Sequence, residues 1–189
     1  ASVSRALVEG ISAEGTSILG GDMAFSLIHR QADEQELAFL EGLGRLSRIA
    51  TTRAMARVAD TNAQTLVELK AVDGAFPLYG TMELGSGGSL QEALAPRGEL
   101  FGAVVEPEML VRLGLEVGDG FRLGRAGFVV TDTIRSEPDR LSSGINFGPR
   151  VAVSDQALAA TGLVQPGSLV RWTYRIRLPE GATTADIPT

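Results

Sequence analysis

One structural unit occurs twice in this sequence, and it restricts what the chain can fold into. The segments VVEPEMLVRLGLEVGDGFRL and VAVSDQALAATGLVQPGSLVRW share one order: a strand, Pro or Asp at a helix start, a short helix, Gly-Leu, a turn glycine and a second strand. Gly114 of the first segment corresponds to Gly162 of the second. A glycine just past a helix tolerates the left-handed backbone that reverses the chain. Both segments are therefore predicted to turn a helix end tightly into a strand, which indicates structure and no particular chemistry.

The spacing of apolar residues predicts the remaining elements. Alternating apolar residues are typical of half-buried strands, and apolar residues three or four apart are typical of helices. In chain order, the expected elements before the repeated unit are a leading helix that ends at Gly20 and Gly21, a strand in GDMAFSLIHR, a helix in ADEQELAFLEGLG, a long strand in RLSRIATTRAMARVA, a strand at Leu66–Val72 and a short helix in LQEALA.

The last strand, Ser168 to Leu178, is predicted to pair with the N-terminal strands, although a long stretch of chain separates them. Val170, Trp172, Tyr174 and Ile176 alternate along it and supply one large apolar face. The N-terminal elements, three strands and one helix, need such a partner to bury their own apolar face.

Composition excludes several classes of protein. The 189 residues are enough for one domain or two small lobes. The formal net charge of −6 and the lack of a basic cluster argue against a nucleic-acid partner. There are no cysteines, so disulfides and thiolate metal sites are excluded. No apolar run approaches the roughly 20 residues that span a bilayer.

Motifs for catalysis are also missing from the sequence. The single histidine, His29, follows a strand and is interpreted as a surface residue, and no nucleophile elbow or zinc-binding histidine pair accompanies it. The stretch ELGSGGSL lacks the third glycine of a dinucleotide fingerprint, and the sole lysine, Lys70, lies in a strand and not in a phosphate-binding loop. We expect no cofactor.

Two pairs of carboxylates could in principle serve acid–base chemistry. Glu106 and Glu108 flank Pro107 at a helix start, where acidic residues favour the helix dipole. Asp132 and Glu137 form the second pair, which lies next to a segment of turn composition. We therefore predict no catalytic residues and no metal site.

Two apolar loop segments are candidates for a contact surface. They are AFPLYG, with Phe76, Leu78 and Tyr79, and GINFGP, with Ile145 and Phe147. Aromatic residues are rare in this chain, and large apolar groups kept in a loop usually persist because something covers them. The alternative is that these side chains fold back and cap a core.

Several segments resemble the large extracytoplasmic domain of FtsX/MacB-type ABC transporter permeases, most closely the YbbP-like branch. They are GGDMAFSLIHR, LVELKAVDGAFPLYG, VVEPEMLVRLGLEVGDGFRLG, EPDR with FGPRVAVS, and LAATGLVQPGSLVRWTYRIRLP. The resemblance covers the chain from about Gly20 to Pro179. LVELKAVDGAFPLYG and TGLVQPGS are specific in combination, whereas the LGLEVGD corner occurs across the wider superfamily.

The resemblance implies an α+β fold of two lobes. A mixed α/β porter-like lobe would comprise residues 21–75 and 167–180, and a strand-rich sabre-like lobe, residues 76–166, would be inserted into it. Residues 1–20 would be a helix leading from a first membrane helix, and the tail 181–189 would lead towards a second.

The resemblance also implies a function without catalysis in this domain. A separate cytoplasmic ABC ATPase would drive the domain by mechanotransmission from the bacterial inner membrane, and the domain would lie on the periplasmic side. The substrate would be hydrophobic or lipid-like, and a periplasmic protein or a lipid would be a further partner. The alternative is a stand-alone periplasmic ligand-binding protein or hydrolase.

Overall fold

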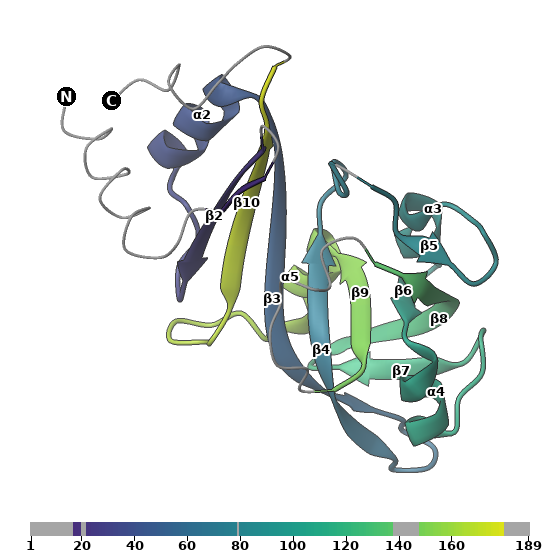
Figure 1. Ribbon diagram of the computed structural model, residues 1–189. Helices are drawn as coiled ribbons and strands as arrows, with labels where there is room; N and C mark the ends of the chain where they lie inside the picture. The colour runs from purple at the N-terminus through teal and green to yellow at the C-terminus, as the bar shows by residue number, and fades with distance from the viewer. Residues whose placement is uncertain (1–16, 20–21, 79, 138–147, 180–189) are drawn as a thin grey trace.

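A single mixed sheet organises the fold. The computed structural model describes residues 17–19, 22–78, 80–137 and 148–179. In chain order the elements are β1 (Ser17–Leu19), β2 (Asp22–Ile28), α2 (Glu34–Leu43), β3 (Arg45–Arg57), β4 (Gln64–Val72), β5 (Glu83–Leu84), α3 (Leu90–Leu94), β6 (Phe101–Val105), α4 (Pro107–Leu113), β7 (Gly120–Leu123), β8 (Ala126–Ser136), β9 (Arg150–Ser154), α5 (Asp155–Thr161) and β10 (Arg171–Arg177). Within these residues ten strands pair in the order β1-β2-β10-β3-β4-β9-β6-β8-β5, and β7 pairs with β3 and β8 (Figure 1). The predicted α+β class is confirmed.

The predicted place of the last strand is also confirmed. β10 lies between β2 and β3 and is antiparallel to both, with Trp172 opposite Leu27 on one side and Ala50 on the other. Trp172, Tyr174 and Ile176 are buried. Tyr174 also fixes the loop before α2, because its hydroxyl accepts a 2.8 Å hydrogen bond from the backbone N–H of Ala32.

The helix α2 begins at a capping box. The Asp33 side chain accepts a hydrogen bond from the Glu36 N–H at 2.8 Å, and the Glu36 carboxylate accepts one from the Asp33 N–H at 2.9 Å. Arg30 adds an ion pair to the Glu36 carboxylate at 2.7 Å. The hydrogen bond from Arg30, the largest influence, lowers the pKa of Glu36 below its usual range. The reciprocal cap explains why the helix begins at Glu34.

The expected leading helix is wrong for the part that the structure describes. Ser17–Leu19 form β1, which pairs antiparallel with the start of β2. Leu19 lies directly opposite Asp22, and the two intervening residues are both glycine, a common sequence for a two-residue hairpin. Residues 1–16, 20–21 and the tail 181–189 lie outside the described residues.

β3 connects the two ends of the sheet. Its first half, from Arg45 to Thr51, pairs with β10, and the stretch Ile49–Arg57 pairs with β4. Its last two residues also pair with β7. Figure 1 shows this strand running from the region of α2 and β10 to the hairpin with β4 near β7. One continuous strand therefore joins β10 along its first half to β4 and β7 along its second half.

Two hydrophobic cores lie on opposite faces of the sheet. On β4, Val67, Leu69 and Ala71 contribute to the larger core, which also includes residues of α2, α4, α5, β7 and β10. Val72, on the other face, contributes to a smaller core with residues of α3, β5 and the segment between β4 and β5. Successive residues of a strand point to opposite faces, so β4 is buried on both. This burial explains why apolar residues occur on both faces of its second half, where Glu68 and Lys70 are the charged exceptions.

The repeated corner has the predicted geometry at both positions. Gly114 ends α4 with φ 64° and Gly162 ends α5 with φ 69°, both in the left-handed region. A Cβ at Gly114 would meet no atom within 4 Å, whereas a Cβ at Gly162 would approach the Arg125 guanidinium to 2.6 Å. Backbone conformation alone therefore requires glycine at the first corner.

Replacing Gly114 by Ala is expected to lower the free energy of unfolding by about 1–2 kcal/mol, because alanine is strained in the left-handed region. Gly42, inside α2 and with open space around it, provides the control. Its replacement by Ala should be neutral or stabilising by up to about 1 kcal/mol. Urea unfolding measures both variants, and an equal effect at the two sites would contradict the assignment.

The described ends of the chain lie at the same end of the sheet. Asp22, the first residue of β2, pairs with Arg177, the last residue of β10, and Arg177 pairs with Arg45 on its other side. β1 adds to the same corner, because Ser17 lies opposite Ala24. The chain thus enters and leaves the described fold at one place.

Candidate functional site: a polar junction at the end of β4

The candidate contact surface is only partly described, and its first residue is not exposed. Phe76 is 5% exposed and packs in the smaller core, with the Lys70 ammonium 4.5 Å from the centre of its ring. Phe76 is buried in one cluster with Ile49 and Val72, so its expected exposure is wrong and the alternative holds for this residue: the side chain folds back onto a core. Leu78 is half-buried. Tyr79, Ile145 and Phe147 lie outside the described residues, so their role in contacts stays a prediction.

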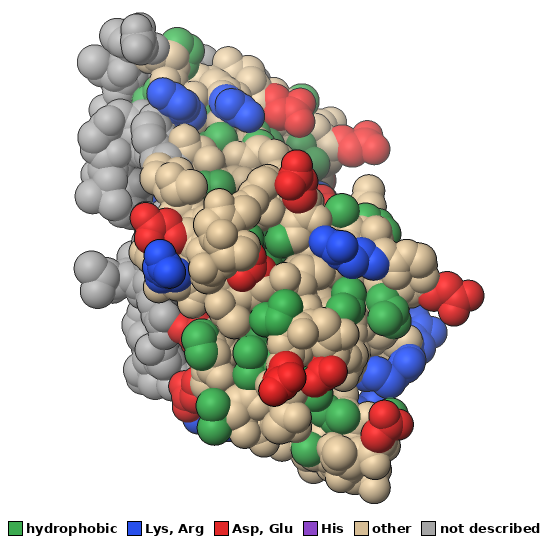
Figure 2. All heavy atoms as spheres, turned by 90° about the vertical axis from the view of Figure 1, so that its right-hand side faces the viewer, with side chains coloured by type: hydrophobic (Ala, Val, Ile, Leu, Met, Phe, Trp, Pro, Cys, Tyr) green, Lys and Arg blue, Asp and Glu red, His purple; other side chains and the backbone are tan. Residues whose placement is uncertain are grey.

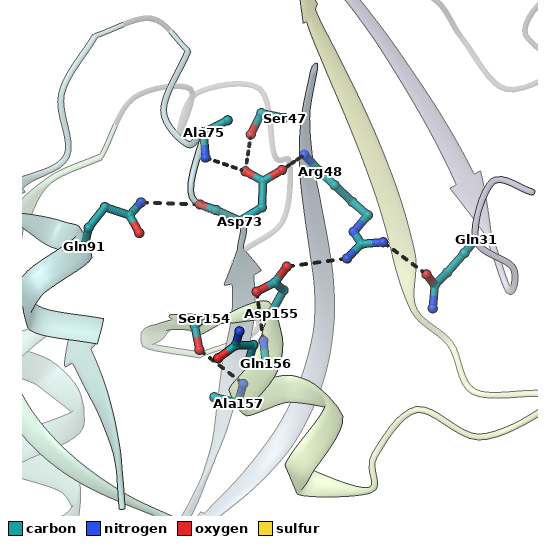
Figure 3. A network of polar contacts seen from close by, with 10 residues as sticks. All are labelled: Gln31, Ser47, Arg48, Asp73, Ala75, Gln91, Ser154, Asp155, Gln156 and Ala157. Atoms are coloured by element: carbon teal, nitrogen blue, oxygen red, sulfur yellow. Dashed lines mark hydrogen bonds and ion pairs between the residues drawn. The ribbon is translucent and has the colours of Figure 1, made fainter. Parts of the chain in front are cut away.

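A carboxylate organises the turn that follows β4. Asp73 accepts hydrogen bonds from the Ser47 hydroxyl at 2.9 Å, from the Arg48 N–H at 2.7 Å and from the Ala75 N–H at 3.1 Å (Figure 3). The Gln91 side chain, from α3, donates to the Asp73 carbonyl at 3.3 Å. Asp73 thus ties the end of β4 to β3, to the next turn and, through its backbone, to α3.

Arg48 extends the same network towards α5. Its guanidinium lies 3.4 Å from the Asp155 carboxylate and 3.4 Å from the Gln31 side-chain oxygen (Figure 3). It also lies over the Trp172 ring, 5.8 Å from the ring centre. The Arg48 and Asp155 side chains are 33% and 36% exposed, so water screens the pair. Arg48 therefore serves mainly to orient neighbouring elements, because its contacts join β3, β10 and the start of α5.

A second, buried cluster of charges lies on the face of the smaller core. Lys70 pairs with Glu137, and Arg150 lies 2.9 Å from Glu68 and 3.3 Å from the other oxygen of Glu137. The side chains of all four are between 1% and 11% exposed. The Glu137 oxygen nearest Arg150 accepts no hydrogen bond within the described residues. The cluster fixes β4, β9 and the end of β8 relative to one another.

In each of the two carboxylate pairs considered from the sequence, the two members bond different partners. Glu106 is the N-cap residue of α4, but its buried side chain accepts a 2.7 Å hydrogen bond from the Arg150 N–H and makes no cap hydrogen bond to the helix. Glu108 is exposed and pairs with Arg112 one turn later in α4. Asp132 bonds Ser86, whereas Glu137 bonds Lys70. Neither pair has the geometry of an acid–base couple.

Asp132 anchors the glycine-rich loop after β5. The Ser86 hydroxyl, the Ser86 N–H and the Thr133 N–H all donate to its carboxylate, the last two at 3.1 and 2.8 Å. Burial, the largest single influence, raises the pKa of Asp132, but the three hydrogen bonds together outweigh it and lower the pKa below its ordinary value.

This lowered pKa predicts a pH dependence of stability. The contribution of Asp132 is present above about pH 4 and is lost as the pH falls through the folded-state pKa. An Asp132→Asn variant should be less stable than the parent at neutral pH, and the difference should shrink below about pH 4. Thermal unfolding at a series of pH values checks this, and a difference that grows on acidification would contradict it.

The remaining chemical groups provide no catalytic arrangement in the described ranges. His29 is exposed just after β2, as predicted, and the histidine, aspartate and glutamate side chains of these ranges form no group able to hold a metal ion. None of the helices in the same ranges is both long and apolar enough to cross a bilayer.

A curated protein and several solved structures are similar to this chain. No family model matches the chain. It is 28% identical over 178 residues to the uncharacterized ABC transporter permease YbbP of Escherichia coli (strain K12), a match that covers 92% of this chain and 20% of that protein. The chain therefore spans about a fifth of the length of the curated relative that it matches.

Solved structures share the fold. The extracellular domain of the noncanonic ABC-type transporter YknZ from Gram-positive bacteria has a TM-score of 0.54 and 11% identity, covering 82% of this chain and 75% of that one. The periplasmic region of MacB from Actinobacillus actinomycetemcomitans has a TM-score of 0.54 and 9% identity, and the match covers 95% of this chain and 83% of that one. A domain of a putative permease protein from Porphyromonas gingivalis has a TM-score of 0.51 and 14% identity, and the match covers 76% of this chain and 65% of that one. The resemblance to extracytoplasmic domains of ABC transporter permeases is confirmed.

Proposed function

We propose that this chain is the extracytoplasmic domain of an ABC transporter permease subunit. In the full protein it would transmit the motion driven by a separate cytoplasmic ATPase to a hydrophobic or lipid-like substrate outside the inner membrane. The observation that carries the proposal is the sequence match to a permease over 92% of this chain. The shared fold of two domains whose names place them outside the membrane supports it.

The position of the chain ends supports the same proposal. A domain inserted between two membrane helices has to begin and end on the side that faces the bilayer. Asp22 and Arg177 pair directly, so the described chain begins and ends at one corner of the sheet. The opposite end of β3, at Arg57, would then point away from the membrane.

We further propose the division into a porter-like lobe, residues 21–75 and 167–180, and an inserted lobe, residues 76–166. β3 and β4 would carry force between them because both strands pair with strands of either lobe. Asp73 lies next to the first boundary, and the ion pair between Arg48 and Asp155 would join the lobes there. This junction would let the domain respond as one body.

Cysteine labelling in cells tests the location. The chain has no cysteine, so Val111→Cys, at a position that is 82% exposed, provides a single reactive site in this domain. In full-length protein, a membrane-impermeant maleimide should label it once the outer membrane is permeabilised. Ala56→Cys, at a fully buried position, is the control and should stay unlabelled. Labelling of Val111→Cys only after the inner membrane is lysed would overturn the proposal.

A further inference from the structure

Two arginines face each other at the end of the sheet where β3 meets β7. Arg57 lies directly opposite Arg122 in the register of these antiparallel strands, and both side chains are exposed. Like charges directly opposite one another destabilise a sheet. Among the described residues Arg57 has no carboxylate partner, and Arg122 donates only to the carbonyl of Arg125, at 2.7 Å. Nothing within the described fold therefore compensates this repulsion.

Apolar side chains lie on the same face. Met55 is two residues before Arg57 and pairs with Leu66 of β4, and these two side chains are 42% and 38% exposed. Leu100, also 38% exposed, lies over Gly127, which pairs with Arg122. The open face is here defined as Met55, Arg57, Leu66, Leu100 and Arg122. It combines three of the chain's exposed large apolar side chains with two cationic ones.

Other exposed apolar groups of the molecule do not form such a combination. On the side that carries α3 and α4, hydrophobic side chains lie in small groups with both acidic and basic side chains among them (Figure 2). Val111, on α4, is 82% exposed but lies next to the ion pair of Glu108 and Arg112. The open face differs because its charged members are both positive, in a chain whose net charge is −6.

We infer that the open face binds an acidic segment of a partner protein, with carboxylates on Arg57 and Arg122 and an apolar side chain against Met55, Leu66 and Leu100. Charge complementarity selects the acidic partner, and arginine beside apolar residues is a common centre of protein interfaces. A protein is favoured over a membrane by distance. β3 rises about 3.3 Å per residue, so Arg57 lies up to about 40 Å from Arg45, which is beside the corner where the chain ends meet. This last step rests on the proposed function.

A peptide-binding experiment on the chain tests the inference directly. The probe is a short fluorescent peptide that alternates serine with glutamate and leucine, and its counterpart carries lysine for glutamate. We expect anisotropy to show binding of the acidic peptide only, weakening with added salt. The double variant Arg57→Glu and Arg122→Glu should weaken binding at least tenfold. The control Arg45→Glu with Arg171→Glu makes the same change of net charge outside the open face, because Arg45 lies opposite Arg177 and Arg171 lies opposite Thr51, and it should change binding less than twofold.

Three results would overturn the inference. One is an equal loss of binding in the two double variants, because net charge alone would then explain it. Another is binding of the chain to phosphatidylglycerol vesicles that the open-face variant abolishes while the peptide stays unbound, which would assign the face to lipid. The third is failure of a Met55→Cys variant to react with maleimide, which would mean that the chain itself covers the face. Because no transport is measured, these outcomes are separate from the test of membrane location.

Discussion

Replacing Glu137 by Ala is expected to lower the free energy of unfolding by about 3–5 kcal/mol, which is typical for the loss of one partner from a buried ion pair. The Glu137 side chain is 1% exposed and lies between Lys70 and Arg150. Its removal would leave Lys70 without this carboxylate in a position where water cannot replace it. Urea unfolding of the variant and the parent measures the difference.

The ion pair of Glu108 with Arg112 is the matched control. It links residues one turn apart on α4, with side chains 58% and 44% exposed. A Glu108→Ala variant should lose less than about 1 kcal/mol, because exposed pairs are weak. If the two variants lost similar amounts, burial of the Glu137 cluster would not be the cause of its strength.

Replacing Phe76 by Ala is expected to cost about 3–5 kcal/mol, the range observed when a core phenylalanine is truncated. The ring is 5% exposed, packs against the smaller core and lies beneath the Lys70 ammonium. A Val117→Ala change, at a position that is 55% exposed, should stay within about 0.5 kcal/mol. A Phe76→Ala domain as stable as the parent would restore the hypothesis that Phe76 is a contact residue.

The two substitutions should not be additive. Lys70 contacts both the Phe76 ring and the Glu137 carboxylate, so each change alters the environment of the other. We expect the double variant to lose less than the sum of the single losses, because the space left by the Phe76 ring would give the Lys70 ammonium access to water that it lacks in the Glu137→Ala variant alone. A loss equal to the sum would indicate that Lys70 does not couple them.

Local sequence patterns predicted the parts of the fold that depend on local rules. The glycine stops at Gly114 and Gly162 follow from backbone sterics at a helix end, and the pairing of β10 follows from the alternation of Trp172, Tyr174 and Ile176. The apolar spacing of the leading segment favours a helix, and only the pair of glycines before β2 indicates the hairpin that contains β1.

The polar contacts could not be predicted because they join residues that are far apart in the chain. Glu68 and Lys70 are an unusual pair of charges in an otherwise apolar strand, and this was a signal that the strand faces a polar cluster. Their partners Arg150 and Glu137 come from β9 and the end of β8, and no local pattern connects them. The Pro and Gly next to Phe76 indicate a turn but do not show which way the turn folds, so the sequence does not decide between a surface and a core position for the ring.

The most direct test of the account is whether this domain moves as one body when the full transporter binds and hydrolyses ATP. One dye pair is attached at Glu41→Cys on α2 and Val111→Cys on α4, and a second measurement uses a dye at Val111→Cys with an acceptor in the outer leaflet of a nanodisc. We expect energy transfer to the membrane to change between the ATP-bound and nucleotide-free states, while transfer within the domain stays constant. Transfer to the membrane that is identical in both states would contradict a role in transmitting motion.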